Sequence, residues 1–342
     1  MTIETRAFAR IGLLGNPSDG YFGRTIACTI GNFSASATFE ESDEVVLLPH
    51  PDHDPSRFGS IEELHTVACR DGYYGGFRVL YAACKKFTEY CLDHDIRLPK
   101  RGFTLSYDTN IPRQVGLAGS SAIITAVFKG LREIYGITDE QLPRPIQPGV
   151  ILSVEEEELD IRAGLQDRVA QTFGGLVYMD FDKGLLNSRG YGEYVPLDPA
   201  LLPGLFLAYL ATPEDSGKAH SDVRARWHRG DAEVVAAMHS FASFATQGRD
   251  ALRNGDVDQF CKLMDRNFNL RWQIFGEKVI GAQNIEMVHI ARAHDAPAKF
   301  SGSGGAVVGV FRDEDHFERL RAAFTAKDYH CVRVDVDPGT DH

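Results

Sequence analysis

The sequence has few of the features that mark metal-binding, disulfide-rich or membrane proteins. Its six cysteines include no C-x-x-C pair and its twelve histidines are scattered, so a zinc site is not expected. The even number of cysteines could suggest disulfides, but without secretory features a reducing compartment is favoured. The most hydrophobic stretch, "LLPGLFLAYLA" at 201–211, is too short to span a bilayer. The first ten residues, "MTIETRAFAR", lack the apolar segment of a secretory signal. We therefore expect a soluble, cytoplasmic protein that does not enter a membrane.

Positive charge is also scarce. Thirty-six Lys and Arg residues face 48 Asp and Glu residues, which gives a net charge of −12 and a pI near 5.5. Nucleic acids and anionic membranes require a basic surface, so bulk binding to either is not expected. A small anion remains possible, because one local cluster of Arg, Lys and backbone N–H groups can hold it. The length of 342 residues exceeds one comfortable hydrophobic core and predicts two domains.

Hydrophobic periodicity predicts an α+β protein. In the first half, strands are expected at 6–15, 25–40, 45–49, 102–109 and 174–181, and helices at 73–91, 123–134, 148–161 and 167–173. The second half predicts a strand at 205–210, helical segments across 231–294, a strand–glycine loop–strand unit at 298–311, a helix at 314–326 and a strand at 330–336. The Gly- and Pro-rich stretch 183–203 separates an N-terminal domain, 1–185, from a C-terminal domain, 186–342.

The most informative stretch is "NIPRQVGLAGSSAIITA" at 110–126, where Gly116, Gly119, Ser120 and Ser121 precede a helix. Such a string often does no more than cap a helix, because Ser and Gly are favourable there. It also lets the backbone approach a ligand and points the N–H groups of a helix N-terminus at an anion, as a phosphate-binding loop does. There is no G-x-x-x-x-G-K-[ST] string and no G-x-G-x-x-G after the first strand, so neither a P-loop nor a Rossmann site is predicted.

Three stretches, in order, resemble the motifs of the GHMP kinases, the superfamily of galactokinase, homoserine kinase and mevalonate kinase. They are "ARIGLLGNPSD" at 9–19, "PRQVGLAGSSA" at 112–122 and "APAKFSGSGGAVVGV" at 296–310. The strings "RDGYYGG", "GLQDRV" and "SGKAHSDVRARW" extend the resemblance toward the glucuronokinases, which phosphorylate the anomeric hydroxyl of D-glucuronate. The resemblance implies a two-domain GHMP kinase fold: an N-terminal domain like domain 2 of ribosomal protein S5 and a ferredoxin-like C-terminal domain. It also implies dependence on ATP and Mg²⁺, in a monomer or homodimer.

The same resemblance assigns catalytic roles to Asp167, Arg10 and Lys218. Asp167 in "GLQDRV" would remove the proton of the acceptor hydroxyl or orient it, although spacing alone favours a helix cap at least as well. Arg10 would lie beside Asp167 and stabilise the reacting oxygen, although a surface Arg at a strand edge is common. Lys218, in the cation-rich stretch 215–226, would approach the phosphates, and the roles of the other cations there stay open.

The implied nucleotide site is the loop and the first turn of the following helix: Pro112, Gly116, Leu117, Ala118, Gly119, Ser120, Ser121 and Ala122. Mg²⁺ would be bound by Ser121 and by Glu155, the first of four consecutive glutamates, because hard oxygen ligands suit this ion. A run of charge is usually a solvated helix face, so only one of the four is expected to face inward. Glu156 remains the alternative ligand.

The implied substrate site combines the first motif with scattered cations and aromatics. Asn16 and Asp19 lie in the substrate loop, and Asp19 would hold sugar hydroxyls unless it is only a turn residue. The carboxylate of a uronic acid favours Arg, and the sequence does not choose among Arg24, Arg70 and Arg113. Tyr74 would form a wall for the sugar unless it packs at a helix start. Gly304 would let the backbone approach closely.

Three alternatives stay open. The chain could phosphorylate another sugar, such as a heptose phosphate or a galactose-like sugar. It could be a non-catalytic sensor of sugar and nucleotide, which would be expected to lack part of the catalytic set. A decarboxylase of the mevalonate-diphosphate type shares the frame but ranks last, because "GLQDRV" resembles the sugar-kinase form of the motif.

Overall fold

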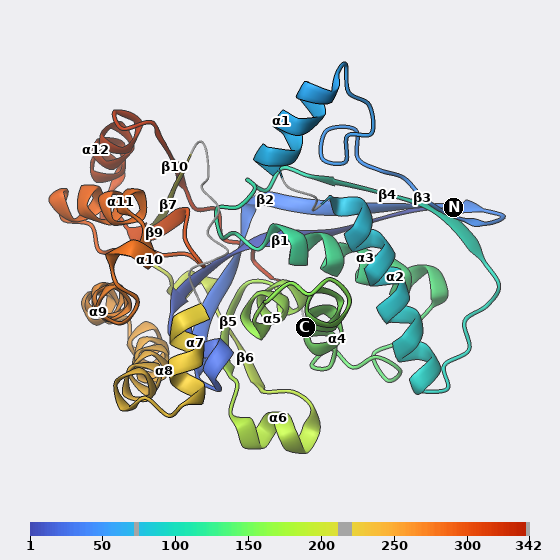
Figure 1. Cartoon of the computed structure of the whole chain (residues 1–342). Helices are drawn as coiled ribbons and strands as arrows, with labels where there is room; N and C mark the ends of the chain where they lie inside the picture. The colour runs from blue at the N-terminus through green and yellow to red at the C-terminus, as the bar shows by residue number, and fades with distance from the viewer. Residues whose placement is uncertain (72–74, 211–220, 340–342) are drawn as a thin grey trace. The chain divides into compact units, whose positions relative to one another are not determined.

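The computed structural model describes residues 1–71, 75–210 and 221–339 (Figure 1). The chain forms two compact units built from separate stretches: Met1–Ala7, Ser34–Asn110 and Ser120–Ala163 in the first, and Phe8–Phe33, Ile111–Gly119 and Gly164–His342 in the second. The strands β1 (Thr2–Leu14) and β2 (Arg24–Ser42) pair with each other and run through both units. In the described ranges, no helix is long and apolar enough to cross a membrane.

The first unit packs helices on a short mixed sheet. The second half of β2 pairs antiparallel with β4 (Gly102–Thr109), and β3 (Val45–Leu47) joins β4 in parallel. Its helices are α1 (Ile61–Asp71), α2 (Gly76–Asp93), α3 (Gly119–Tyr135) and α4 (Gln147–Ser153), with the π-helical turn η2 (Val154–Glu158) directly after α4. The core is aromatic: the rings of Phe39 and Phe103 lie 5.1 Å apart, and those of Phe87 and Phe128 lie 5.7 Å apart, both edge to face.

The second unit contains the rest of the six-stranded sheet to which β2 belongs, and a separate four-stranded sheet. The first half of β2 pairs with β5 (Leu176–Asp180), which pairs with β6 (Glu193–Leu197). A four-stranded antiparallel sheet has the order β10–β7–β9–β8, with β7 at Leu205–Leu210, β8 at Ala298–Phe300, β9 at Ala306–Val310 and β10 at Tyr329–Arg333. Numbered along the chain this order is 4-1-3-2, with helices after the first and third strands. That arrangement is ferredoxin-like, so this part of the predicted fold is confirmed.

Helices α9, α11 and α12 pack against the four-stranded sheet, and α8 lies beside α9 (Figure 1). The helices of this unit are α5 (Leu165–Phe173), α6 (Lys183–Arg189), α7 (Ser221–His228), α8 (Ala232–Arg253), α9 (Val257–Phe275), α10 (Glu277–Ile280), α11 (Ala282–Ala293) and α12 (Glu314–Thr325), with the 3₁₀ turns η1 (Ser18–Tyr21) and η3 (Pro199–Leu201). Asp256 and Asp313 cap α9 and α12 by accepting hydrogen bonds from backbone N–H groups.

Several of the described elements differ from what the periodicity predicts, among them the strand β6, which lies in the stretch predicted as a linker. Helix α1 is not expected, although the Ser60 hydroxyl accepts a hydrogen bond from the N–H of Glu63 at its start and the Glu63 carboxylate accepts one from the N–H of Gly59. Helix α6 lies in the stretch predicted as a linker, where Asp182 caps its start and Gly190, with a φ of 82°, ends it. Because β6 continues the sheet of β5 past residue 185, the exact domain boundary stays a prediction.

Candidate functional site

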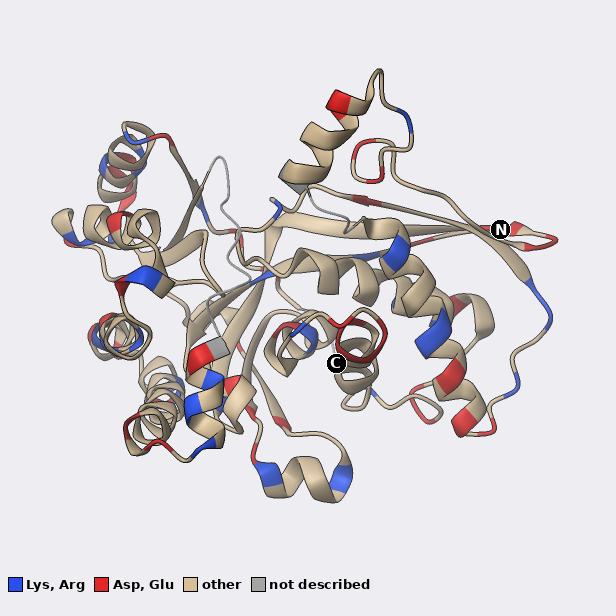
Figure 2. Cartoon of the chain, viewed as in Figure 1, with Lys and Arg blue, Asp and Glu red and all other residues tan. Residues whose placement is uncertain are grey.

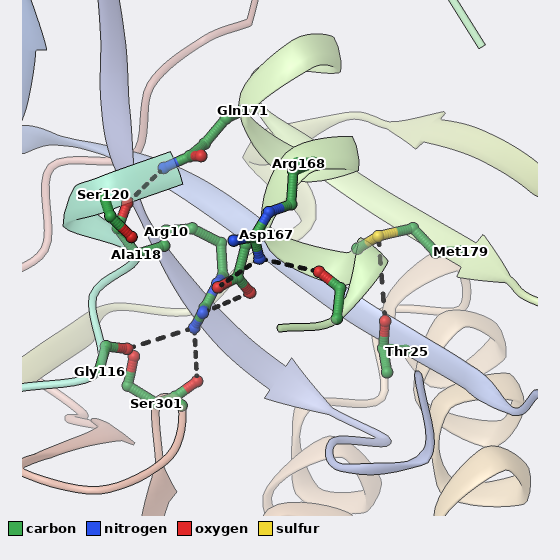
Figure 3. Close-up of polar contacts among 12 residues, drawn as sticks. Arg10, Thr25, Gly116, Ala118, Ser120, Asp167, Arg168, Gln171, Met179 and Ser301 are labelled. Atoms are coloured by element: carbon green, nitrogen blue, oxygen red, sulfur yellow. Dashed lines mark hydrogen bonds and ion pairs between the residues drawn. The ribbon is translucent and has the colours of Figure 1, made fainter. Parts of the chain in front are cut away.

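The centre of the site in the second unit is a buried ion pair between Arg10 and Asp167 (Figure 3). Arg10 lies on β1 and is 4% exposed, and the Asp167 side chain, in the first turn of α5, is 21% exposed. The N-cap of α5 is Gly164 and no side chain caps this helix, so the helix-cap interpretation of Asp167 does not hold. The interpretation of Arg10 as a surface residue is also wrong, because its side chain is 4% exposed and pairs with Asp167 inside the second unit.

Arg10 also connects this ion pair to two loops. Its Nη1 donates to the carbonyl oxygen of Ser301 at 3.0 Å and, more weakly, to that of Gly116 at 3.4 Å. Its backbone N–H donates to the carbonyl of Leu117 at 3.1 Å. One residue of β1 therefore holds both the predicted phosphate loop and the glycine-rich loop in place beside Asp167.

The predicted phosphate loop occupies 112–118 and leads directly into α3. Gly116 and Ala118 both have left-handed backbone, with φ of 71° and 64°. Gln171 on α5 donates to the carbonyl of Ala118 at 2.9 Å and to that of Phe8 at 3.1 Å. Of the other residues predicted for this site, Pro112 and Leu117 lie in the loop, and the first turn of α3 contains Gly119, Ser120, Ser121 and Ala122.

The two glycine loops approach so closely that side chains do not fit between them. A Cβ on Gly116 would lie 2.7 Å from the carbonyl oxygen of Gly304, and a Cβ on Gly305 would lie 2.7 Å from the Cα of Val115. Gly305 has a φ of 82° and Gly304 a φ of 147°, so glycine is required here by both space and backbone. The predicted close approach at Gly304 is therefore a backbone–backbone contact.

Polar side chains from distant segments hold the predicted substrate loop, which contains Asn16 and Asp19. Asn267 on α9 accepts from the N–H of Gly15 at 2.8 Å and donates to the carbonyl of Asn16 at 3.1 Å. Lys299 on β8, 1% exposed, donates to the side-chain oxygen of Asn16 at 2.7 Å and to the carbonyl of Gly12 at 2.9 Å. Burial, followed by the charges of nearby arginines, holds the pKa of Lys299 well below its usual range. The Asn16 oxygen is thus already engaged by the protein.

Asp19 lies on η1 at the end of the same loop. Its carboxylate packs so closely against Gly164, the N-cap of α5, that a Cβ there would collide with it. The pKa of Asp19 is raised to about 6, mainly by burial and then by the charge of Asp167, while the charge of Arg10 acts in the opposite direction. The structure therefore brings the substrate-loop carboxylate within electrostatic reach of the central ion pair.

The first unit places one glutamate of the acidic run against α3. Glu155 is 1% exposed and accepts a hydrogen bond from the hydroxyl of Ser120 at 2.6 Å. Glu156 and Glu157 are exposed, and Glu157 pairs with Lys86 at 2.7 Å. The expectation that one glutamate faces inward is confirmed, and the geometry favours Glu155 over Glu156. Ser121 is also 1% exposed.

The remaining predicted residues are scattered. Arg24 on β2 is half-exposed and donates to Asp180 at 2.6 Å, and Arg113 is exposed in the phosphate loop. Lys218 and Tyr74 lie outside the described residues, as does the side chain of Arg70. In the ranges that the structure describes, no group of three or more His, Cys, Asp and Glu residues is arranged to hold a metal ion.

Sequence reasoning missed several buried cations and amides around this site. Arg168 and Arg271 are 2% and 3% exposed. Burial, more than any nearby charge, lowers their pKa to about 9 and about 10. The four-residue spacing of Asn267 and Arg271 places both on one face of α9. This spacing is the local signal that could have pointed to them, and it is weak because a polar pair on a helix is far more often solvated.

Residues 78–175 match the family model "GHMP kinases N terminal domain", and residues 249–330 match "GHMP kinases C terminal". Glucuronokinase 1 of Arabidopsis thaliana is 52% identical over 306 residues, which cover 90% of this chain and 84% of that protein. The D-glycero-alpha-D-manno-heptose 7-phosphate kinase of Campylobacter jejuni is 23% identical and covers 91% of this chain and 88% of its own.

Solved structures show the same architecture. Galactokinase of Lactococcus lactis, complexed with galactose, has a TM-score of 0.72 at 15% identity and covers 100% of this chain and 95% of its own. The two family models and the 52% identical relative define the class as a small-molecule kinase. The chain belongs to the GHMP kinase family. It is an enzyme, a sugar kinase that uses ATP.

Proposed function

We propose that this enzyme transfers the γ-phosphoryl group of ATP to the anomeric hydroxyl of D-glucuronate and forms D-glucuronate 1-phosphate. The observation that carries the proposal is the buried Arg10–Asp167 pair, held against the phosphate loop in a chain that is 52% identical to a glucuronokinase over 90% of its length. The heptose 7-phosphate kinase is less than half as similar, so the sugar acid is the first candidate.

In this reaction the anomeric oxygen attacks the γ-phosphorus, the bond from phosphorus to the ADP oxygen breaks, and the hydroxyl proton leaves to Asp167. Arg10 orients the Asp167 carboxylate and balances its charge, because the two are paired inside the protein. Asp19 accepts hydrogen bonds from sugar hydroxyls and so aligns the acceptor. Most of the rate acceleration then comes from positioning and from charge stabilisation rather than from covalent participation.

The triphosphate binds at the loop 112–118 and the N-terminus of α3. The carbonyl oxygens of Gly116, Leu117 and Ala118 accept hydrogen bonds from Arg10 and Gln171, so an anion at this helix terminus meets backbone N–H groups. Lys218 is the proposed side-chain cation for the phosphates.

Mg²⁺ fits the oxygen donors of the first unit. Glu155 is buried and its carboxylate is directed at the Ser120 hydroxyl in the first turn of α3, and carboxylate and hydroxyl oxygens are ligands that Mg²⁺ prefers. We assign Glu155 and Ser121 to the ion. When bound, it would neutralise charge on the phosphate oxygens.

A coupled ADP-release assay with Mg-ATP tests the proposal over D-glucuronate, D-galacturonate, D-glucose, D-galactose and heptose 7-phosphate. Turnover with glucuronate that exceeds the other sugars by at least a hundredfold in kcat/KM is the expected result. Preference for a neutral sugar or for the heptose phosphate would overturn the choice of sugar and leave the kinase. Tight ATP binding without turnover on any sugar would favour a non-catalytic sensor.

A further inference from the structure

The second unit buries more cationic than acidic side chains around the substrate loop. The cations, each at most 4% exposed, are Arg10, Arg168, Arg271 and Lys299. The carboxylates whose charges act on this group are Asp19 and Asp167. Arg10 and Arg168 face Asp167, and Lys299 is bound by the oxygens of Gly12 and Asn16. Arg271 donates to neutral backbone carbonyls, and a buried charge is stabilised by a counter-charge, so Arg271 is the buried cation from which we argue.

Arg271 is placed to meet that ligand. One turn earlier on α9, Asn267 holds the backbone of the substrate loop. The Arg271 guanidinium donates to the carbonyl oxygens of Gly302 at 2.8 Å and Ser303 at 3.3 Å, which fixes its orientation. Its Nε is buried and has no hydrogen-bond partner among the residues that the structure describes. Two carbonyls use only two of its five N–H groups, so the side chain keeps donors for an anion.

Arg224 approaches the substrate loop from α7. The ring of Trp227 packs edge to face on Tyr21 of η1, with 5.2 Å between ring centroids. Arg224 lies three residues before Trp227 and therefore on the same face of the helix. Burial raises the pKa of the Tyr21 hydroxyl, and the positive charges of Arg224 and Arg271 both act against this. Arg224 and Arg271 thus both lie near Tyr21.

The other cation of this helix is used differently. Arg226 donates to Asp231 at 2.9 Å and to Glu233 at 2.9 Å, both at the start of α8, whereas Arg224 is exposed. Figure 2 shows the basic residues of α7 as blue bands on this short helix. Arg226 is therefore a structural residue, whereas Arg224 is available to a ligand.

We propose that Arg271 and Arg224, near Tyr21 of the substrate loop, bind the carboxylate of the sugar acid and determine specificity for it. The planar guanidinium fork matches the two oxygens of a carboxylate. The inference rests on the proposed function and deepens it. It replaces the candidates suggested by the sequence, of which Arg24 is already paired with Asp180.

The test compares D-glucuronate with D-glucuronamide, which has the same shape and a neutral amide in place of the carboxylate. Arg224→Gln and Arg271→Lys are measured for the KM of glucuronate and of ATP by ADP release. The dissociation constants of both sugars are measured by titration calorimetry.

We expect each variant to bind glucuronate ten- to a hundredfold more weakly, as loss of a charge-assisted hydrogen bond does. Glucuronamide binding and the KM of ATP stay within about threefold, because neither ligand interaction involves the carboxylate. Arg229→Gln, beside the same helix, is the control and leaves all values unchanged.

Three results would overturn the inference. They are unchanged glucuronate binding in both variants, an equal loss for glucuronate and glucuronamide, and a rise confined to the KM of ATP, which would assign these cations to the phosphates. Arg224 is exposed, so its variant keeps the test valid if Arg271→Lys does not fold. A wild-type enzyme that neither binds nor phosphorylates glucuronate overturns the proposed function itself. Wild-type turnover with insensitive variants overturns this inference alone.

Discussion

Two acidic regions of the chain carry the same kind of charge in opposite surroundings. Along the run Glu155–Glu158, the side chains of Glu156 and Glu157 face solvent, Glu158 pairs with Lys85, and only Glu155 is buried. In the second unit, both Asp19 and Asp167 stand among buried arginines. The density of acidic residues is therefore a poor guide to function. A carboxylate that is desolvated and has a specific partner is a better one.

The largest effect is expected from Asp167→Asn. Asparagine has nearly the same shape and can still accept a hydrogen bond from Arg10, but it cannot take a proton from the acceptor hydroxyl. We expect kcat to fall by about 10²–10⁴-fold, the usual contribution of a general base, while ATP still binds. Steady-state kinetics and nucleotide titration measure both quantities.

The matched control is Asp160→Asn. Asp160 is exposed and has a left-handed φ of 53°, a conformation that asparagine tolerates. Its kcat should equal that of the wild type. If Asp167→Asn loses less than about tenfold in kcat, orientation by the remaining residues is sufficient and Asp167 is not the base.

Comparing Glu155→Gln with Glu157→Gln distinguishes the buried glutamate of the run from an exposed one. The first change removes the buried charge beside α3, and we expect the Mg²⁺ concentration required for half-maximal rate to rise about 10–100-fold, as for loss of one charged contact. The second change removes an exposed charge and should leave that concentration unaltered. Fluorescence titration of ATP with and without Mg²⁺ gives an independent readout. Equal behaviour of the two variants would contradict the contrast drawn between buried and exposed glutamates.

Asp19 gives a pH-dependent prediction. Its pKa is raised from 3.8 to about 6 in the folded protein, so between these values the folded state binds more protons than the unfolded state. Stability from this group is complete below pH 3.8 and is lost as pH rises through about 6. Asp19→Asn removes this dependence. We expect the variant to gain about 1–3 kcal/mol relative to the wild type between pH 4 and pH 7.

Urea unfolding at pH 4, 5, 6 and 7 measures the difference. A difference that is flat across this range would show that Asp19 is not desolvated. Asp222→Asn, which changes an exposed carboxylate on α7, is the control and should show no such slope.

The smallest effect is expected at the surface pairs of the glutamate run. Lys86 pairs with Glu157 at 2.7 Å and with Glu89 at 3.1 Å. The Lys86 side chain is 15% exposed, but Glu157 and Glu89 are 64% and 39% exposed. Water screens such pairs and the long side chains lose freedom, so Lys86→Gln should lower the free energy of unfolding by less than about 1 kcal/mol. Urea unfolding measures it. A loss of several kcal/mol would mean that this face is part of the core.

Much of the fold could be predicted from the sequence because local patterns specify it. The strand at 102–109 agrees with β4, the helix after the Gly/Ser loop agrees with α3, and Gly136, with a φ of 66°, ends that helix as expected. The helix predicted to begin at Pro148 begins one residue earlier as α4 and continues as the turn η2. Helices α1 and α6 were not expected, since their apolar faces are weak and their capping residues are the main signal.

The residues of the site were predictable to the extent that motifs carry them. Arg10 and Asp167 follow from the resemblance, and the structure brings them together. The resemblance does not show which group each side chain of the site forms a hydrogen bond or an ion pair with. Asn16 is engaged by Lys299, whose nitrogen is contributed from 283 positions away along the chain. Arg10 bonds to Ser301 across 291 positions.

The sequence by itself determined most of the strands and helices, the positions where only glycine fits, and the family. Periodicity, capping and backbone preference act over a few residues, and the motifs are short. Only the tertiary structure decided which glutamate is buried, that Lys299 braces the substrate loop, and that Arg271 stands beside it. Whether a charged side chain is buried, and which group it pairs with, depends on segments hundreds of residues apart. Burial and pairing in turn set the pKa and the reactivity of that side chain.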